Sequence, residues 1–529
     1  MPRFAIKEAP AGVKLRGGYY TPQPVARFVA RWVSEAGNRL LEPACGDGAI
    51  LGPLVEAAGD GVVAVELLPA EATKASRHCG IGVTAADFFS WFAVTRHGSF
   101  DGVAGNPPYI RFGSWAEAHR TPALALMVSQ GMRPTRLTNA WVPFVVASVL
   151  AVRPGGRVGL VLPAELLQVG YAAPLRSYLV DRCSSITVIS FQQLLFPGIQ
   201  QEVVLLLAEA GPGPAAIRTV EVPDAARLSE LHLTTPSVRA RLHETEKWTK
   251  YYLDTEAIEM LRAVRADARL SPLRQWAEVD VGVVTGRNGF FCMTAEEATQ
   301  RGLAHVTVGL VSRSQQVPGL TFTAADLAEQ DQSAARTRLL VIPDDGRTLR
   351  TKKVAAYLAA GAADGIPTGY KCRIRRNWWQ VPSAWIPDGF MLRQISTHPR
   401  LSANLAGATS TDTVHRVRVR SGVDMASLAT AAYNSATFAL SEVIGRSYGG
   451  GILELEPSEA EELPVPDPAL VPPSILAKAD DLIRERRVED ALDLVDQAVL
   501  IDTLGFEPDQ VTACRSAWIR LRDRRTGRR

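Results

Sequence analysis

The chain has 529 residues, and at about 150 residues per domain this length predicts two to four domains that each bury a core. Its 47% apolar and 21% charged residues are typical of a folded globular protein, and they exclude disordered, collagen-like and fibrous classes. The formal net charge of +3 says little by itself about partners.

No segment predicts a membrane span or a secretory leader. The most apolar uncharged stretch, residues 137–152, contains Asn139 and Pro143 and falls short of the roughly 18 apolar residues that a span requires. The N-terminal residues include Glu8 and lack an apolar run of signal-peptide length. The six cysteines form no CxxC pair and no zinc-type spacing with histidine. We therefore expect a cytoplasmic protein without a disulfide framework or a metal site.

The first part of the chain alternates helical and strand-like segments. Residues 24–36 place Val25, Phe28 and Val29 at helical spacing, which predicts an amphipathic opening helix. Short apolar runs then alternate with helical segments as far as residue 209. This alternation of strand-like and helical segments predicts a doubly wound α/β sheet. In such sheets ligands bind at the carboxyl ends of the strands, where the strand order reverses.

Acidic residues end successive predicted strands. Residues 40–48, LLEPACGDG, predict a strand and a tight glycine turn. Glu66 ends the next strand, where a carboxylate can accept hydrogen bonds from both hydroxyls of a ribose. Asp87 ends a third strand and can accept from an adenine amine while Phe88 packs against the ring. Each acid alone is also typical of a solvated strand end, but together they outline a nucleoside-sized ligand.

The tetrad Asn106-Pro107-Pro108-Tyr109 closes another apolar run. Residues before proline are held extended, and the prolines lack amide donors, so the carbonyls here point outward from a stiff backbone. Together with the Asn106 side chain they can accept both hydrogens of a conjugated amino group, which localises its lone pair for in-line attack. Tyr109 adds a flat face on which a planar base can stack.

The composition changes in the second half of the chain. AGPGPAA after Glu209 predicts a hairpin or a linker at the edge of the first domain, and the alternating residues 415–420, HRVRVR, suit an exposed strand. Residues 331–420 carry fifteen Lys and Arg against six Asp and Glu. Residues 473–526 predict two or three helices that end in an arginine-rich tail.

Read in order, GYYTP (residues 18–22), EPACGDG (42–48), Glu66, Asp87-Phe88 and NPPY (106–109) resemble the motif series of the gamma-class amino-methyltransferases of DNA. These are the TaqI-type N6-adenine enzymes of restriction-modification systems. The resemblance implies a Rossmann-like class I methyltransferase domain that uses S-adenosyl-L-methionine, followed by an α+β target-recognition region ending in helices. We place these domains at residues 1–235, 236–465 and 466–529.

The same resemblance implies roles for individual residues. The donor pocket is expected to be lined by Tyr20, Thr21, Glu42, Ala44, Cys45, Gly46, Glu66, Asp87 and Phe88. Asn106 and Pro107 are expected to bind the target amine, with Tyr109 and Phe196 on the two faces of the extruded base. A core aromatic at a strand end is the alternative interpretation of Phe196.

Three segments of the second region also resemble target-recognition domains: residues 282–291, 370–379 and 446–451. Their arginines are the candidates for DNA binding, namely Arg287, Arg373, Arg375, Arg376 and Arg446. Trp378 and Trp379 are either part of this interface or simply part of a core.

The resulting expectation is a monomeric, site-specific DNA methyltransferase that acts on a flipped-out adenine in double-stranded DNA. The resemblance implies a cognate restriction endonuclease as a separate chain. Methylation of cytosine at N4 is the alternative chemistry, and NPPY also occurs in protein-glutamine and ribosomal-RNA methyltransferases. None of the nine lysines has an acid two positions before it, which argues against a fused nuclease of the common metal-dependent type. The acids at the donor positions argue against a DNA-binding module without catalysis.

Overall fold

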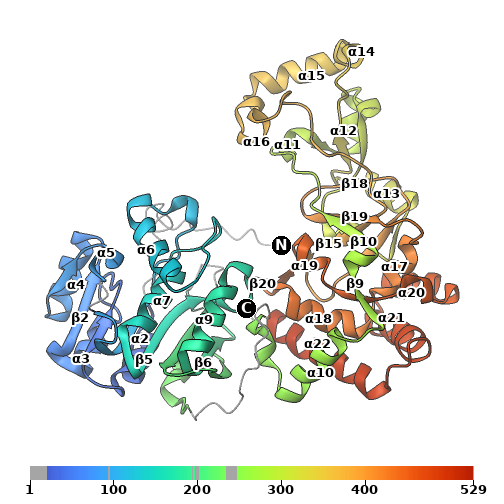
Figure 1. Cartoon of the computed structure of the whole chain (residues 1–529). Helices are drawn as coiled ribbons and strands as arrows, with labels where there is room; N and C mark the ends of the chain where they lie inside the picture. Colours follow the sequence, from blue (N-terminus) through green and yellow to red (C-terminus); the bar gives the residue numbers. More distant parts are fainter. Residues whose placement is uncertain are drawn as a thin grey trace. The chain divides into compact units, whose positions relative to one another are not determined.

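The computed structural model describes residues 21–92, 96–193, 195–196, 202–233, 247–448 and 450–527. Its internal contacts divide the chain into two compact units (Figure 1). The first comprises Met1–Thr255, Tyr448–Gly451 and Arg524–Arg529, and the second comprises Glu256–Ser447 and Ile452–Asp523. Both contain helices and strands, so the expected mixed α/β class is confirmed.

The first unit is built on an eight-stranded sheet with the order β3-β2-β1-β4-β5-β7-β6-β8. Its strands are β1 (Leu40–Glu42), β2 (Val62–Glu66), β3 (Val83–Ala85), β4 (Phe100–Gly105), β5 (Val152–Pro163), β6 (Cys183–Phe191), β7 (Val203–Ala210) and β8 (Ala216–Val222). Neighbouring strands are parallel except that β7 runs antiparallel to β5 and β6. The strand order reverses between β1 and β4, which is where ligands bind in open α/β sheets.

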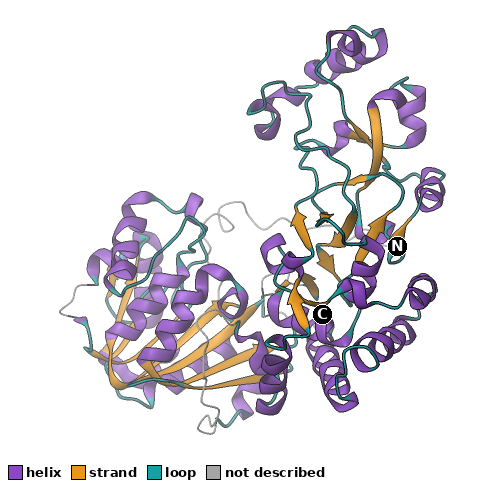
Figure 2. Cartoon of the chain, turned by 45° about the vertical axis from the view of Figure 1, so that its right-hand side comes forward, coloured by secondary structure: helices purple, strands orange, loops and turns teal. Residues whose placement is uncertain are grey.

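Two groups of helices cover this sheet (Figure 2). One consists of α2 (Gln23–Ser34), α3 (Leu51–Ala58) and α4 (Pro69–Cys79), and the other of α5 (Phe88–Trp91), α6 (Glu117–Ser129), α7 (Trp141–Ala151) and α9 (Ala173–Arg182), with α8 (Glu165–Gln168) preceding α9. Helix α2 confirms the expected opening helix. Pro24 lies in its first turn, and Val25, Phe28 and Val29 are buried on its apolar face.

The segment AGPGPAA is neither a hairpin nor a linker at the edge of the unit. It connects β7 to β8, and β8 pairs in parallel with β6 rather than with β7. Both edges of β7 are already paired, with β5 on one side and β6 on the other, so the next strand can add only at the free edge of β6.

The second unit contains a five-stranded sheet, β10-β19-β15-β17-β13, and a four-stranded sheet, β11-β14-β12-β18. Their strands are β10 (Ala277–Asp280), β11 (Cys292–Met293), β12 (Thr307–Val311), β13 (Thr321–Phe322), β14 (Arg338–Leu340), β15 (Gly389–Leu392), β17 (Leu401–Asn404), β18 (Thr409–Ser410) and β19 (Val414–Val419). Two smaller sheets complete the unit. One pairs β9 (Leu270–Pro272) with β22 (Pro464–Pro466), and in the other β21 (Ile452–Glu454) lies between β16 (Gln394–Ile395) and β20 (Arg446–Tyr448).

A separate apolar core lies around the four-stranded sheet. It is shared with α11 (Asn288–Phe291), α12 (Ala295–Gln300), α14 (Gly346–Leu349), α15 (Lys352–Ala363) and α16 (Tyr370–Arg373), which lie together in Figure 1. Phe291 and Cys372 are fully buried in it. Trp378 and Trp379 pack against this core while partly exposed, which favours the core interpretation of both tryptophans.

The strand expected at residues 415–420 is present as β19, but its expected exposure is wrong. β19 lies inside the five-stranded sheet, and His415 and Arg416 are only 0% and 2% exposed. The Arg416 guanidinium lies 4.4 Å from the ring centroid of Trp385 and donates to the Val281 carbonyl over 2.9 Å. These groups replace water around the cation, a substitution that the alternating sequence pattern does not reveal.

The helices expected over residues 473–526 are present as three. They are α20 (Pro473–Arg484), α21 (Val488–Val495), which continues into a π-helical turn at Asp496–Ile501, and α22 (Pro508–Thr526). The remaining helices of the unit are α10 (Thr255–Arg265), α13 (Ala324–Asp331), α17 (Met425–Ala431), α18 (Ser435–Ile444) and α19 (Pro457–Ala460). Within the described ranges, no helix is both long and apolar enough to cross a membrane.

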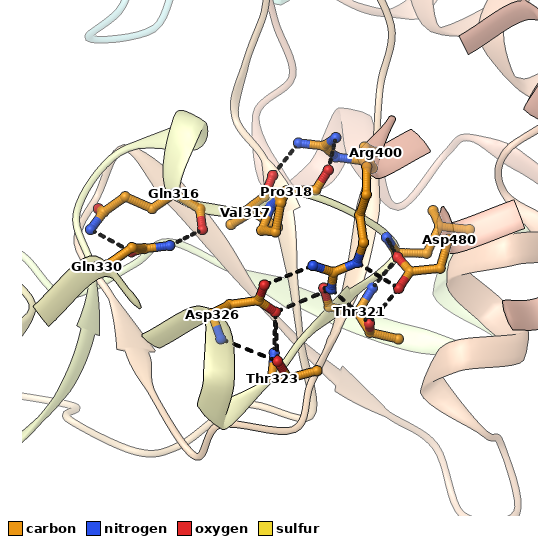
Figure 3. A network of polar contacts seen from close by, with 11 residues as sticks. Gln316, Val317, Pro318, Thr321, Thr323, Asp326, Gln330, Arg400 and Asp480 are labelled. Atoms are coloured by element: carbon orange, nitrogen blue, oxygen red, sulfur yellow. Dashed lines mark hydrogen bonds and ion pairs between the residues drawn. The ribbon is translucent and has the colours of Figure 1, made fainter. Parts of the chain in front are cut away.

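Arg484 joins α20 to the strands and helices beside it through a polar network, and Figure 3 shows its partners Thr321, Asp326 and Asp480. Its guanidinium donates to Asp326 over 2.7 Å, to Asp480 over 2.8 Å and to the Thr321 carbonyl over 2.8 Å. In the same network Arg400 donates to the Pro318 carbonyl over 3.1 Å. The network therefore fixes α20 against α13 and β13 by charge-assisted hydrogen bonds.

Candidate functional site

Four polar residues singled out by the sequence lie at one edge of the eight-stranded sheet. Glu42 is the last residue of β1, and Glu66 is the last residue of β2. Asn106 directly follows β4, and Asp87 lies two residues after the end of β3. These four strands are parallel neighbours, so their carboxyl ends lie side by side. Glu42 and Asn106 flank the point where the strand order reverses.

The asparagine of NPPY is held by the segment that precedes α2. The Asn106 side-chain nitrogen Nδ2 donates to Oγ1 of Thr21 over 3.3 Å, and Thr21 is only 7% exposed. This contact places the amide nitrogen toward Thr21 and therefore the amide oxygen on the opposite side of the planar group. Tyr20, the neighbouring donor-pocket candidate, lies outside the described residues.

The tyrosine of NPPY is turned toward the sheet. The Tyr109 hydroxyl donates to the Val161 carbonyl of β5 over 3.1 Å, and its ring packs against the apolar cluster of α2 and the central strands. Phe196, buried at 5% exposure, belongs to the same cluster. The structure therefore brings both predicted stacking residues to one apolar region, and their contact with a base remains a prediction.

Glu42 is the most unusual carboxylate of this edge. Its side chain is 1% exposed, and among the described residues its Oε2 atom has no hydrogen-bond partner. Burial raises the pKa of Glu42 well above the usual value, and the charges of Glu66 and Asp47 raise it further. A buried acceptor without a donor is costly unless a ligand supplies one, and a cation is the ligand that such a group favours most.

The glycine turn after β1 is fixed by Glu66. One carboxylate oxygen of Glu66 accepts from the Gly46 backbone N–H over 2.9 Å, and the other accepts from the Leu68 N–H over 2.9 Å. Gly46 has φ +54°, a left-handed conformation that favours glycine. Ala44 is half-buried beside the turn, and the Cys45 thiol is buried, which raises its pKa. Glu66 thus connects the ends of β1 and β2 at the predicted donor pocket.

Asp87 caps helix α5 and also binds a histidine that the sequence analysis missed. Its Oδ1 atom accepts from the Ser90 N–H over 2.9 Å, and its Oδ2 atom lies 3.1 Å from Nδ1 of His119 on α6. Phe88 is 4% exposed and its ring stacks on Phe144 at 5.3 Å. No local pattern connects His119 to Asp87, because they are 32 residues apart and on different helices.

Leu67 is a second residue that the sequence analysis missed. It follows Glu66 at the end of β2, beside the candidate ligand site, and is 44% exposed. An apolar side chain at this place can cover one face of a planar ring. The sequence signal that could have identified Leu67 is its position directly after Glu66, an acidic residue that ends a strand.

The five arginines predicted to bind DNA differ in their surroundings. Arg287, Arg373 and Arg376 are exposed. The Arg375 guanidinium instead donates to two backbone carbonyls of the loop before α11, and Arg446 pairs with a carboxylate of α19 over 2.9 Å. The first three side chains are therefore accessible to a partner, while the other two make internal contacts.

Comparison with known proteins gives two family matches. The model "Type II methyltransferase M.Eco57I, C-terminal domain" matches residues 245–500, and the model "Eco57I restriction-modification methylase" matches residues 75–196. The Type II methyltransferase M.XamI of Xanthomonas campestris pv. amaranthicola is 25% identical over 85% of each chain. M.AccI of Acinetobacter calcoaceticus, also a Type II methyltransferase, is 20% identical over 83% of each chain.

These matches support a DNA methyltransferase of a restriction-modification system. Among solved structures, the Type IIL restriction-modification enzyme MmeI in complex with DNA has a TM-score of 0.55 and 11% identity. The likeness covers 95% of this chain and 72% of that chain. At this identity it indicates a common fold.

Proposed function

We propose that this chain is a site-specific methyltransferase that transfers a methyl group from S-adenosyl-L-methionine to the N6 amine of an adenine flipped out of double-stranded DNA. The observation that carries the proposal is the position of Asn106. It follows β4 at the reversal of strand order, beside the buried carboxylate of Glu42 on β1. An acceptor for an amine and a site for a cationic cosubstrate therefore lie on neighbouring strands.

The residues at this edge suit S-adenosyl-L-methionine. The orphaned, buried Oε2 atom of Glu42 is an acceptor for the ammonium group of the methionine part. In this proposal Glu66 accepts from the ribose hydroxyls and Asp87 from the adenine amine, with Phe88 and Leu67 as apolar contacts for the ring; the ends of β2 and β3 on one sheet edge support it. When bound, the cosubstrate supplies an electrophilic methyl group on its sulfonium.

The protein's part in the reaction is orientation and charge stabilisation. Extruding the adenine costs a few kcal/mol and frees its amine from the base pair. The carbonyl oxygens of Asn106 and Pro107 accept the two N–H groups, which localises the nitrogen lone pair and aims it at the methyl group. These acceptors also stabilise the positive charge that develops on nitrogen before one proton leaves to water. Tyr109 and Phe196 hold the faces of the ring.

Adenine is preferred over cytosine because of the gamma-class order of the motifs with NPPY. The test is to express the chain in a host that lacks DNA methylation and to digest the recovered DNA for nucleoside mass spectrometry. N6-methyladenine supports the proposal. N4-methylcytosine in its place supports the alternative chemistry, and unmodified DNA contradicts both.

The proposed biological role is protection of DNA from a cognate restriction endonuclease that is a separate chain. We further propose that the methyltransferase acts as a monomer in the cytoplasm. Challenge of the recovered DNA with restriction endonucleases that cut at the methylated sequence tests the role, since only DNA from cells with active methyltransferase is expected to stay intact.

A further inference from the structure

Two segments of the second unit form one surface that the proposed chemistry does not yet use. We call residues 282–291 and 366–376 the basic platform. Its sequence contains five basic residues and no acidic residue. Helices α11 and α16, which belong to these segments, lie near each other in Figure 1.

The two segments are locked together by close contacts. The Arg375 guanidinium donates to the Val284 carbonyl over 3.0 Å and to the Thr285 carbonyl over 2.7 Å. Gly286 has φ +75°, and a Cβ at this position would lie only 2.5 Å from Cβ of Lys371. The close approach therefore requires glycine, and the platform is preformed rather than assembled from two mobile loops.

Large apolar side chains point outward from this platform. Tyr370 is 65% exposed, Ile374 is 60% exposed and Val284 is 37% exposed. Tyr370 and Ile374 are four residues apart on one helical turn, closed by the hydrogen bond from the Ile374 N–H to the Tyr370 carbonyl over 3.3 Å. They therefore lie on the same face of the turn. Exposed apolar side chains held on a rigid surface are typical of a binding site.

The surrounding charge identifies the partner as a polyanion. Arg287, Lys371, Arg373 and Arg376 are exposed around the apolar side chains. In duplex DNA the phosphates satisfy the cations, but an apolar side chain can be buried only against the bases, at a thymine methyl group or between base planes. A surface that combines apolar and basic side chains therefore suits duplex DNA, which offers both bases and phosphates.

We propose that Tyr370, Ile374 and Val284 contact the bases of the target duplex and set sequence preference, while Arg287, Lys371 and Arg373 hold its phosphates. The inference rests on the proposed function. Arg375 acts as a positioning residue, because its guanidinium hydrogen-bonds to two carbonyls of the other segment and so holds the two segments of the platform together.

The experiment compares binding to two duplexes by fluorescence anisotropy over a series of salt concentrations. One duplex carries the sequence that the wild-type chain methylates, as mapped by single-molecule sequencing, and the other carries it scrambled. Tyr370→Ala and Ile374→Ala are expected to raise Kd for the target duplex by about tenfold, with little change for the scrambled duplex and an unchanged salt slope. Arg373→Ala is expected to weaken both duplexes alike and to reduce the salt slope by about one.

Leu405→Ala is the matched control, because Leu405 is an apolar side chain of the second unit with 64% exposure and lies outside the platform. Tyr370→Ala and Ile374→Ala remove exposed side chains, so thermal melting is expected to stay unchanged and to confirm folding. The inference is overturned if both variants behave like Leu405→Ala on both duplexes while the wild type methylates DNA. If the wild type methylates no DNA, the proposed function fails and the inference fails with it.

Discussion

The side-chain nitrogen of Asn106 donates a hydrogen bond to the hydroxyl of Thr21 over 3.3 Å, and so connects the end of β4 to the segment before α2. The bond orients the amide plane of Asn106. It therefore makes Thr21 a positioning residue for the acceptor that is proposed to bind the target amine, in addition to its expected place in the donor pocket.

Thr21→Val is expected to lower kcat by about fivefold, because one neutral hydrogen bond of about 1 kcal/mol no longer fixes the amide. The KM for DNA is expected to stay within about twofold, since the platform is untouched. Thr21→Ser keeps the hydroxyl and is expected to restore kcat in the same steady-state assay. A Thr21→Val enzyme with unchanged kcat would remove this contact from the mechanism.

Glu42→Gln is expected to stabilise the chain in the absence of cosubstrate. Burial raises the pKa of Glu42 above its unfolded value, so between these two pKa values the folded chain binds more protons than the unfolded chain. The free energy of unfolding therefore falls as the pH rises through this window, because ionising the buried Glu42 carboxyl costs free energy in the folded chain. Glu42→Gln removes this cost.

Circular dichroism melting against pH, with and without S-adenosyl-L-methionine, measures this effect. Without cosubstrate the Tm of Glu42→Gln is expected to exceed that of wild type at neutral pH, and the two are expected to converge below the unfolded pKa of glutamate. The stabilisation by cosubstrate is expected to be smaller in the variant, because the ammonium group has lost its anionic partner. A lower Tm for the variant at neutral pH without cosubstrate would contradict the account.

His119→Ala is expected to weaken cosubstrate binding by about fivefold, the effect of losing a hydrogen bond of about 1 kcal/mol that orients Asp87. His119 Nδ1 lies 3.1 Å from the Asp87 carboxylate, and an asparagine amide can place a donor at a similar distance from the backbone. His119→Asn is therefore expected to recover most of the affinity. Isothermal titration with S-adenosyl-L-methionine measures both variants, with the exposed His305→Ala as the control.

Arg484→Met is expected to lower the free energy of unfolding of the second unit by about 1–3 kcal/mol, because hydrogen bonds to charged groups are lost in a partly buried network. Arg487→Met is the control, since its ion pairs with Glu485 and Asp490 are at least half exposed. Urea unfolding followed by tryptophan fluorescence measures the difference. Equal loss in the two variants would show that the network contributes no more than a surface pair.

The same network predicts a pH dependence. Burial alone would raise the pKa of Asp326, but hydrogen bonds from Arg484 and Thr323 hold that pKa below the usual value. The unfolded chain thus binds more protons at this site in mildly acidic solution, and stability is lost as the pH falls toward the folded pKa. Arg484→Met is expected to flatten this acid dependence relative to wild type.

The polar residues at the sheet edge could be predicted from the sequence because each follows an apolar run that reads as a strand. Glu42, Glu66, Asp87 and Asn106 are local signals of this kind, and the parallel sheet brings them to one edge. Which contacts they make was not predictable. The hydrogen bond that Asn106 donates to the Thr21 hydroxyl, for example, joins residues 85 positions apart.

Long-range contacts also explain what the sequence analysis missed. Arg416 looked exposed because a cation alternating with apolar residues is usually solvated, and only the fold supplies its carbonyl partner and the Trp385 ring. Arg375 looked like its neighbours in a basic run, although its guanidinium holds a loop 90 residues earlier in the chain. His119 carried no sequence signal, because a single histidine on a helix is more often a surface residue.

The most direct test of the central claim is methyl transfer by Asn106→Ala in a single-turnover assay, with DNA and cosubstrate affinity measured on the same preparation. The account predicts a fall in the transfer rate of about a hundredfold or more, since a group that stabilises developing charge is removed. Both affinities are expected to remain within about twofold of wild type. Transfer at the wild-type rate would contradict the claim that Asn106 holds the target amine.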